Sequence, residues 1–85
     1  MILVTGGTGL LGSHLLFDLT NENDKIRATY RYDNTRLEVF ELFKYYDSSS
    51  AERRWQKIEW VKADLREIPM LSECFSDVKY VYHCA

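Results

Sequence analysis

The feature that most constrains this chain is a run of glycines near its N-terminus. The run Thr5-Gly6-Gly7-Thr8-Gly9-Leu10-Leu11-Gly12 follows a short apolar segment, residues 1–4. Behind it, Leu15, Leu16 and Leu19 continue from Gly12 at the spacing of one helix face. A strand that passes through a glycine turn into a helix presents backbone N–H groups at the positive end of the helix dipole, where an anion binds. The run therefore predicts a phosphate-binding turn.

Each of three glycines has a physical reason to lack a side chain. A Cβ at Gly6 or Gly9 would block the close approach of a pyrophosphate to the backbone. Gly12 is expected to face the strand and to let the helix pack closely on the sheet. We expect the cofactor contacts of this turn to come from Gly6, Thr8, Gly9, Leu10, Leu11 and Gly12.

Two other interpretations of the turn compete with a dinucleotide site. Gly7 and Gly12 have the spacing of a nucleoside-triphosphate-binding P-loop, but Ser13-His14 follows where that motif requires Lys-Ser/Thr. A glycine-rich turn that binds no ligand is the second alternative. The strand–turn–helix context at the start of the chain favours a dinucleotide over both.

The rest of the chain alternates between strand and helix patterns. We expect strands at 1–4, 26–30, 58–61 and 78–82. Strands joined by helical crossovers run parallel. The sequence therefore predicts one α/β domain, a doubly wound parallel sheet of about four strands in the order 3-2-1-4 with helices on both faces.

Several local signals bound the helices. The polar run 20–24 is expected to end the first helix, and Thr35-Arg36-Leu37-Glu38 predicts a capping box at the start of the second. Glu52-Arg53-Arg54 is interpreted as part of a solvated loop, and a short helix is expected from about Ile68, with Pro69 in its first turn. The aromatic residues at helical spacing in 40–46 are interpreted as packing residues rather than as base-stacking platforms.

Composition excludes several classes of protein. The net charge of −2 lacks the basic surplus of a nucleic-acid binder. No apolar run approaches the roughly 20 residues of a membrane span, and no signal peptide is visible, so we expect a cytoplasmic protein. Cys74 and Cys84 do not form a zinc pattern with either histidine, so we expect reduced thiols and no metal site.

The glycine run Thr5-Gly6-x-x-Gly9-x-x-Gly12 resembles the T-G-x-x-G-x-x-G signature of the extended short-chain dehydrogenase/reductase family of epimerases, dehydratases and dihydroflavonol-type reductases. Two later segments resemble family landmarks in the same order. Ala63-Asp64-Leu65 is similar to the motif whose aspartate holds the adenine, which places Asp64 and Leu65 in the cofactor site. Val81-Tyr82-His83-Cys84-Ala85 is similar to the H-x-A-A strand ending beside the nicotinamide ribose, which adds Cys84 and Ala85. The resemblance implies a Rossmann-type fold that binds NAD(P).

The end of the second predicted strand bears on the choice of cofactor. The family's acidic position falls at Tyr30, and Arg31 follows it. The stretch 26–31, Ile-Arg-Ala-Thr-Tyr-Arg, resembles NADP-dependent, dihydroflavonol-reductase-like members, which implies NADP(H) with Arg31 on the 2′-phosphate. NAD is the second choice, because Arg31 can be an ordinary surface arginine and Asp33 lies close enough in sequence to accept the ribose.

The family's catalytic Tyr-x-x-x-Lys pair is absent, because no tyrosine here is followed by lysine four residues later. We assign no catalytic residue: His14 is interpreted as a helix-start side chain and His83 as shaping the pocket. The chain is thus expected to be the N-terminal part (1–85) of an NAD(P)-binding domain without its catalytic and substrate-binding parts. Alone it is expected to be inactive, whereas the parent protein would transfer hydride between nicotinamide and the carbonyl or carbinol carbon of a small-molecule substrate.

Two further expectations follow. A non-catalytic NAD(P)-binding sensor or scaffold would share every feature of these residues and remains an alternative, as does a remnant that binds nothing. The fourth predicted strand, 78–82, would be an unpaired apolar edge, so we also expect self-association or marginal stability.

Overall fold

A four-stranded parallel sheet forms the centre of the protein in the computed structural model, which describes residues 1–23, 25–63 and 76–84. The strands are β1 (Ile2–Thr5), β2 (Ile26–Tyr30), β3 (Ile58–Lys62) and β4 (Tyr80–His83). They lie in the order β3-β2-β1-β4, and every neighbouring pair is parallel. The predicted strand order is confirmed.

The register aligns the carboxyl ends of the strands along one edge of the sheet. Ile2 pairs with Ile26 on one side and with Tyr80 on the other, and Tyr30 pairs with Lys62. Ligands of open α/β sheets bind outside this edge, near the point where the strand order reverses. In this sheet the reversal lies between β1 and β4.

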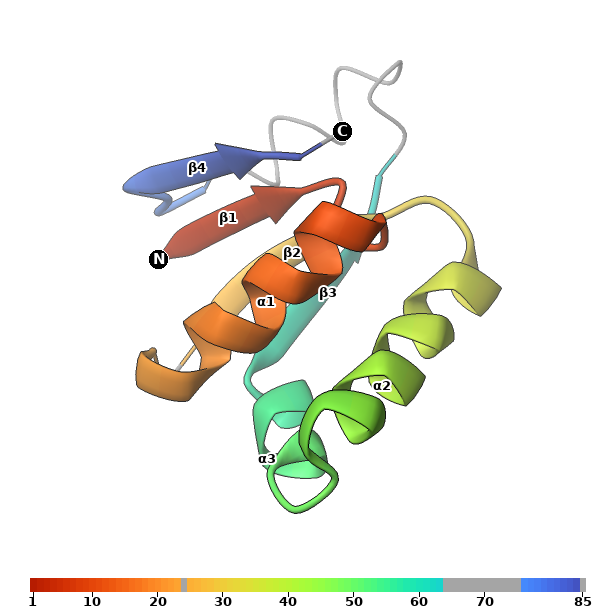
Figure 1. Cartoon of the computed structure of the whole chain (residues 1–85). Coiled ribbons are helices and arrows are strands. Elements are labelled where there is room, and N and C mark those ends of the chain that lie inside the picture. Colours follow the sequence, from red (N-terminus) through yellow and green to blue (C-terminus); the bar gives the residue numbers. More distant parts are fainter. Residues whose placement is uncertain (24, 64–75, 85) are drawn as a thin grey trace.

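Three helices cover one face of the sheet, namely α1 (Leu10–Glu22), α2 (Asp33–Asp47) and α3 (Ala51–Gln56) (Figure 1). Their apolar sides meet the sheet in one core cluster, whose buried members are Val4, Leu16, Ile26, Ala28, Val39, Phe43, Ala51 and Ile58. On the other face, a second cluster holds Leu3 and Ala63, with Val61 and Val78 packed against it. The helix expected from about residue 68 lies outside the described residues.

The first helix is longer than expected at both ends. α1 begins at Leu10 rather than Gly12 and continues through the polar residues to Glu22. Thr20 is tolerated inside the helix because its hydroxyl donates to the carbonyl oxygens of Leu16 and Phe17, at 2.8 and 3.0 Å. Local polarity was therefore a poor guide to the helix end, since the polar side chain is satisfied by its own preceding turn.

The predicted capping box at Thr35 is wrong. α2 begins at Asp33, and its N-cap residue Tyr32 makes no side-chain capping bond. Thr35 lies inside the first turn, where its hydroxyl donates to the Tyr32 carbonyl oxygen at 2.7 Å. Asp33, in the same turn, places a negative charge near the positive end of the helix dipole.

The interpretation of residues 52–54 as a solvated loop is also wrong. They form part of α3, and Arg54 is buried, with 8% of its surface exposed. Its guanidinium donates to the carbonyl oxygen of Phe17, to Asn21 Oδ1 and to Ser50 Oγ, and it stacks 4.0 Å from the centre of the Phe17 ring. Arg54 therefore ties α3 to the end of α1.

A serine-rich turn joins α2 to α3. Asp47 accepts hydrogen bonds from the Ser49 hydroxyl at 2.6 Å and from the Ser50 hydroxyl at 2.9 Å. These two bonds, the Ser49 bond first, hold the pKa of the Asp47 carboxyl below its ordinary value. The turn positions Ser50 to accept a hydrogen bond from Arg54 at 2.9 Å.

The fourth strand lies at an edge of the sheet and begins two residues later than expected, at Tyr80. Val78 instead packs against the second core cluster. All four β4 side chains are exposed, Tyr80 by 66%. Self-association through this strand stays a prediction.

Across the described ranges, no helix is long and apolar enough to cross a membrane.

The Arg54 contacts predict a large difference between two adjacent arginines. Arg54→Met leaves the acceptors on α1 without their donor and should lower the free energy of unfolding by about 1–3 kcal/mol. Arg53→Met, at an exposed position of the same helix, should change it by less than about 0.5 kcal/mol. Urea denaturation followed by circular dichroism measures both, and equal losses would contradict the assigned role of Arg54.

Candidate dinucleotide-binding site

The glycine turn at the end of β1 folds back on itself against the start of α1. Gly6 adopts a φ of 71°, a left-handed conformation that favours glycine, and its carbonyl oxygen accepts the Gly9 N–H at 3.2 Å. A Cβ on Gly12 would lie 2.2 Å from the Gly6 carbonyl oxygen and 2.9 Å from the Gly7 Cα. Gly12 therefore packs against the turn's own backbone, and not chiefly against the strand as expected.

Gly7, to which the sequence assigned no role, also requires the absence of a side chain. A Cβ there would lie 2.9 Å from Leu16 Cδ1 and 3.4 Å from the Ala28 Cβ. Gly7 is buried between α1 and β2, and a methyl group there would have to displace the end of the fully buried Leu16 side chain. Three of the chain's four glycines are thus explained by the fold itself.

Gly9 is different, because the fold does not require a glycine there. Its φ of −74° is open to any residue, and a Cβ would meet nothing closer than the Gly6 carbonyl oxygen at 3.6 Å, an ordinary contact. Gly9 is exposed, as are Leu10 (79%) and Leu11 (70%), while Thr8 is half-buried. These residues form an open surface on which a ligand can approach the backbone.

The start of α1 presents unsatisfied backbone donors at this surface. The first intrahelical bond runs from the Ser13 N–H to the Gly9 carbonyl oxygen, so the three preceding N–H groups have no helical partner. In the described chain, α1 has neither a side-chain N-cap bond nor an acidic residue in its first turn. The open donors, the helix dipole and the bare Gly9 backbone together fit a pyrophosphate.

Side chains from the neighbouring strands hold the turn in place. The Thr29 hydroxyl oxygen, on β2, accepts the Gly6 N–H at 3.3 Å. On β4, His83 Nδ1 hydrogen-bonds the buried Thr5 hydroxyl at 2.5 Å, and the Cys84 N–H donates to the Thr5 carbonyl oxygen at 2.9 Å. Cys84 and His83 therefore lie beside the turn, and the role of Cys84 as a cofactor contact stays a prediction.

Thr29 was missed from the sequence because a threonine in a strand has no local signal for such a role. Its position one residue before Tyr30, where the sequence predicts cofactor selection, is the one pattern that could have indicated it.

The carboxyl end of β2 lies beside the turn and carries the residues expected to select the cofactor. Arg31 is exposed directly after β2, with its guanidinium 5.2 Å from the centre of the Tyr32 ring. The Asp33 carboxylate, the alternative ribose ligand, lies instead 3.8 Å from Lys62 Nζ. Arg31 thus lies at the carboxyl end of β2, and Asp33 is directed toward β3; a role of Arg31 in cofactor binding stays a prediction.

Other expected site residues divide into two groups. Asp64, Leu65 and Ala85 lie outside the described residues. His14 is exposed on α1, 3.7 Å from Asp18 and edge-on to the Tyr46 ring, which is a surface packing arrangement. Over the described residues, no three His, Cys, Asp or Glu side chains gather as metal ligands.

The strand order, the crossover helices and the glycine turn at the carboxyl edge together define a Rossmann-type α/β fold. The chain belongs to the NAD dependent epimerase/dehydratase family, whose model matches residues 2–85. Its members belong to the extended short-chain dehydrogenase/reductase family, as the sequence motifs indicated, and have NAD(P)-dependent functions of the oxidoreductase type.

Curated relatives from plants match almost the whole chain. It is 32% identical over 79 residues to the bifunctional UDP-glucose 4-epimerase and UDP-xylose 4-epimerase 1 of Pisum sativum, a match covering 93% of this chain and 22% of that protein. UDP-glucose 4-epimerase 2 of Arabidopsis thaliana is 29% identical over 79 residues, covering 93% and 21%. The chain therefore spans about a fifth of the length of these relatives.

The different surroundings of Gly9 and Gly12 predict effects of very different size when each is replaced by alanine. Gly12→Ala forces a Cβ into the Gly6 carbonyl and should lower the free energy of unfolding by about 3 kcal/mol. Gly9→Ala places its methyl group in open space and should change stability by less than about 1 kcal/mol. Chemical denaturation of the two variants tests this, and comparable destabilisation by Gly9→Ala would show that the turn is more crowded than described.

Proposed function

We propose that this chain is the dinucleotide-binding part of an NAD(P)-dependent oxidoreductase, epimerase or dehydratase, and that NADP(H) is its preferred cofactor. The observation that carries the proposal is Gly9, an exposed glycine that neither backbone conformation nor protein packing requires. A ligand resting on the turn supplies the missing reason, because a side chain there would hold its phosphates away from the α1 donors.

The residues present fit the two phosphates and the adenosine end of the cofactor. The backbone of Gly9, Leu10, Leu11 and Gly12 would hold the pyrophosphate, with Thr8 beside it. Arg31 would pair with the 2′-phosphate, which is doubly charged or nearly so and is absent from NAD. Asp64 and Leu65 are proposed for the adenine, and Cys84 and Ala85 for the side of the nicotinamide ribose.

The bound cofactor would supply the hydride chemistry, and the chain would supply position and charge. No tyrosine in the 85 residues is followed by lysine four positions later, so we propose that this chain alone turns over no substrate. The catalytic and substrate-binding parts would belong to the longer protein, whose relatives are named as nucleotide-sugar epimerases.

Titration calorimetry with NADP⁺ and NAD⁺ tests the cofactor proposal. Wild-type protein should bind NADP⁺ at least about tenfold more tightly, since one charge-assisted contact to phosphate contributes on the order of 1.5–3 kcal/mol. Equal affinities, or tighter NAD⁺ binding, would overturn the NADP assignment. Absence of binding to either cofactor would overturn the dinucleotide site itself.

Gly9→Ala tests the site independently of the choice between the two cofactors. It should weaken the binding of both NADP⁺ and NAD⁺ by about tenfold or more, while the unliganded protein keeps its stability. Tyr45→Ala, which removes an exposed side chain from α2 at a position outside the proposed site, serves as the control. Unchanged affinity of Gly9→Ala for both cofactors would contradict phosphate binding at this turn.

A further inference from the structure

His83, the last residue of β4, contacts the residue that leads into the glycine turn. Its Nδ1 lies 2.5 Å from the hydroxyl oxygen of the buried Thr5, while His83 itself is exposed. Thr5 is the register partner of His83, and Gly6 follows Thr5 directly. The two strands end side by side where the chain turns into α1 (Figure 1). The imidazole is therefore fixed beside the turn and stays open to solvent.

The contact with Thr5 persists in both charge states of the ring. A neutral imidazole accepts the Thr5 hydroxyl hydrogen at Nδ1 or donates to the hydroxyl oxygen, depending on its tautomer, and a protonated imidazole donates. Protonation therefore changes the charge beside the turn without releasing the ring. Imidazole is the side chain that ordinarily makes this change between about pH 5 and pH 8.

The charges on the same face of the sheet lie farther from the carboxyl edge. Residues 1–12, which comprise β1, the glycine turn and the start of α1, include no charged side chain. Arg27, in register with Leu3, pairs with Glu59 at 3.4 Å, and Lys25 lies 3.8 Å from the same carboxylate. These charges are occupied with one another, two residues or more before the row of His83.

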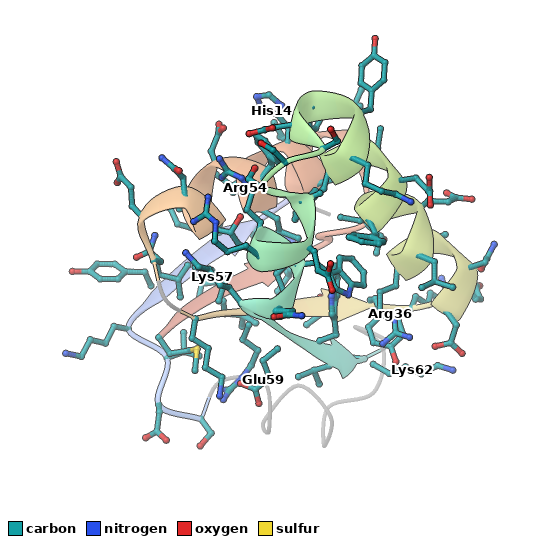
Figure 2. All side chains as sticks on the ribbon, turned by 90° about the horizontal axis from the view of Figure 1, so that it is seen from below. His14, Arg36, Arg54, Lys57, Glu59 and Lys62 are labelled. Atoms are coloured by element: carbon teal, nitrogen blue, oxygen red, sulfur yellow. The ribbon has the colours of Figure 1, made fainter. Side chains whose placement is uncertain are left out.

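Other titratable groups near β4 belong to the opposite face or to other strand ends. Tyr80 and Tyr82 alternate with His83, so they point to the other face, where Cys84 packs against the first core cluster. His14 pairs with Asp18 on the helix side, across the sheet from Glu59 (Figure 2).

Three cations stand at the remaining strand ends. Lys79 precedes the amino end of β4, and Arg31 and Lys62 stand at the carboxyl ends of β2 and β3, two and three strands away. Among the described residues, His83 is thus the group beside the turn that changes its charge near neutral pH.

From this arrangement we propose that His83 links cofactor binding to pH. The ring takes up a proton from solvent when a pyrophosphate occupies the open N–H groups of α1, because the negative charges favour the cationic imidazole. By reciprocity, cofactor affinity rises as the pH falls through the range in which the imidazole protonates. This role rests on the proposed function and adds to it a residue of β4 and a dependence on pH.

The pH dependence of NAD⁺ affinity tests the role of His83. NAD⁺ is the probe because its pyrophosphate keeps the same charge over the tested range and it lacks the titrating 2′-phosphate of NADP⁺. Calorimetric titration of wild-type protein should show the affinity falling by about threefold or more between about pH 5.5 and about pH 8.5. His83→Asn keeps a hydrogen-bonding group beside Thr5 but takes no proton, so it should abolish this fall.

His14→Asn is the matched control, since the chain has two histidines and His14 lies outside the proposed contacts. It should keep the wild-type pH profile. A merely structural role of His83 would weaken binding in His83→Asn by the same factor at every pH, and that result would refute the proposal.

Proton uptake is a second readout, and its wild-type part needs no variant. Titrations near neutral pH in two buffers of different ionisation enthalpy give the number of protons taken up per NAD⁺ bound. Wild-type protein should take up a measurable fraction of a proton, and His83→Asn should take up none.

The outcomes separate this role from the proposed function. Wild-type affinity that is independent of pH, or binding without proton uptake, would refute the role of His83 and leave the dinucleotide site standing. Loss of the pH dependence in His14→Asn instead of His83→Asn would refute it as well. Binding of NADP⁺ alone moves the same comparison to that cofactor, where the difference between wild type and His83→Asn isolates His83. Binding of neither cofactor at any pH would overturn the proposed function and this role together.

Discussion

The close approach of Gly12 to the backbone of Gly6 and Gly7 is the contact on which the site depends. A methyl group at Gly12 would overlap the Gly6 carbonyl oxygen, at 2.2 Å. Because that space is empty, α1 can begin directly against the end of β1. The first-turn N–H groups of the helix are thereby held at the carboxyl edge of the sheet. The carboxyl end of β2, with Tyr30 and Arg31, lies at the same edge.

The four glycines divide into three that the fold explains and one, Gly9, for which we propose a ligand. Gly6 permits the left-handed turn, and Gly7 and Gly12 permit close packing. Gly9 meets no such demand, although it stands in the same short motif. A glycine motif can thus be separated physically into a structural and a binding component, and only the second predicts a cofactor.

The sheet order and the position of the glycine turn could be predicted from sequence, because short apolar runs, helix periodicity and right-handed crossovers leave few arrangements. The capping box at Thr35 and the loop around Arg54 could not. Thr35 was misassigned because its hydroxyl bonds within the first turn, and Arg54 because its acceptors lie on α1, 37 residues away in the case of Phe17.

The central claim is that the open backbone between Gly9 and Gly12 binds the phosphates of a nicotinamide dinucleotide. Titration of ¹⁵N-labelled protein with NADP⁺, followed by amide chemical shifts, tests it most directly. The largest shifts should appear at the N–H groups of Gly9, Leu10, Leu11 and Gly12, with a second group at the end of β2 around Arg31. Shifts confined to other parts of the chain, or none at saturating ligand, would contradict the account.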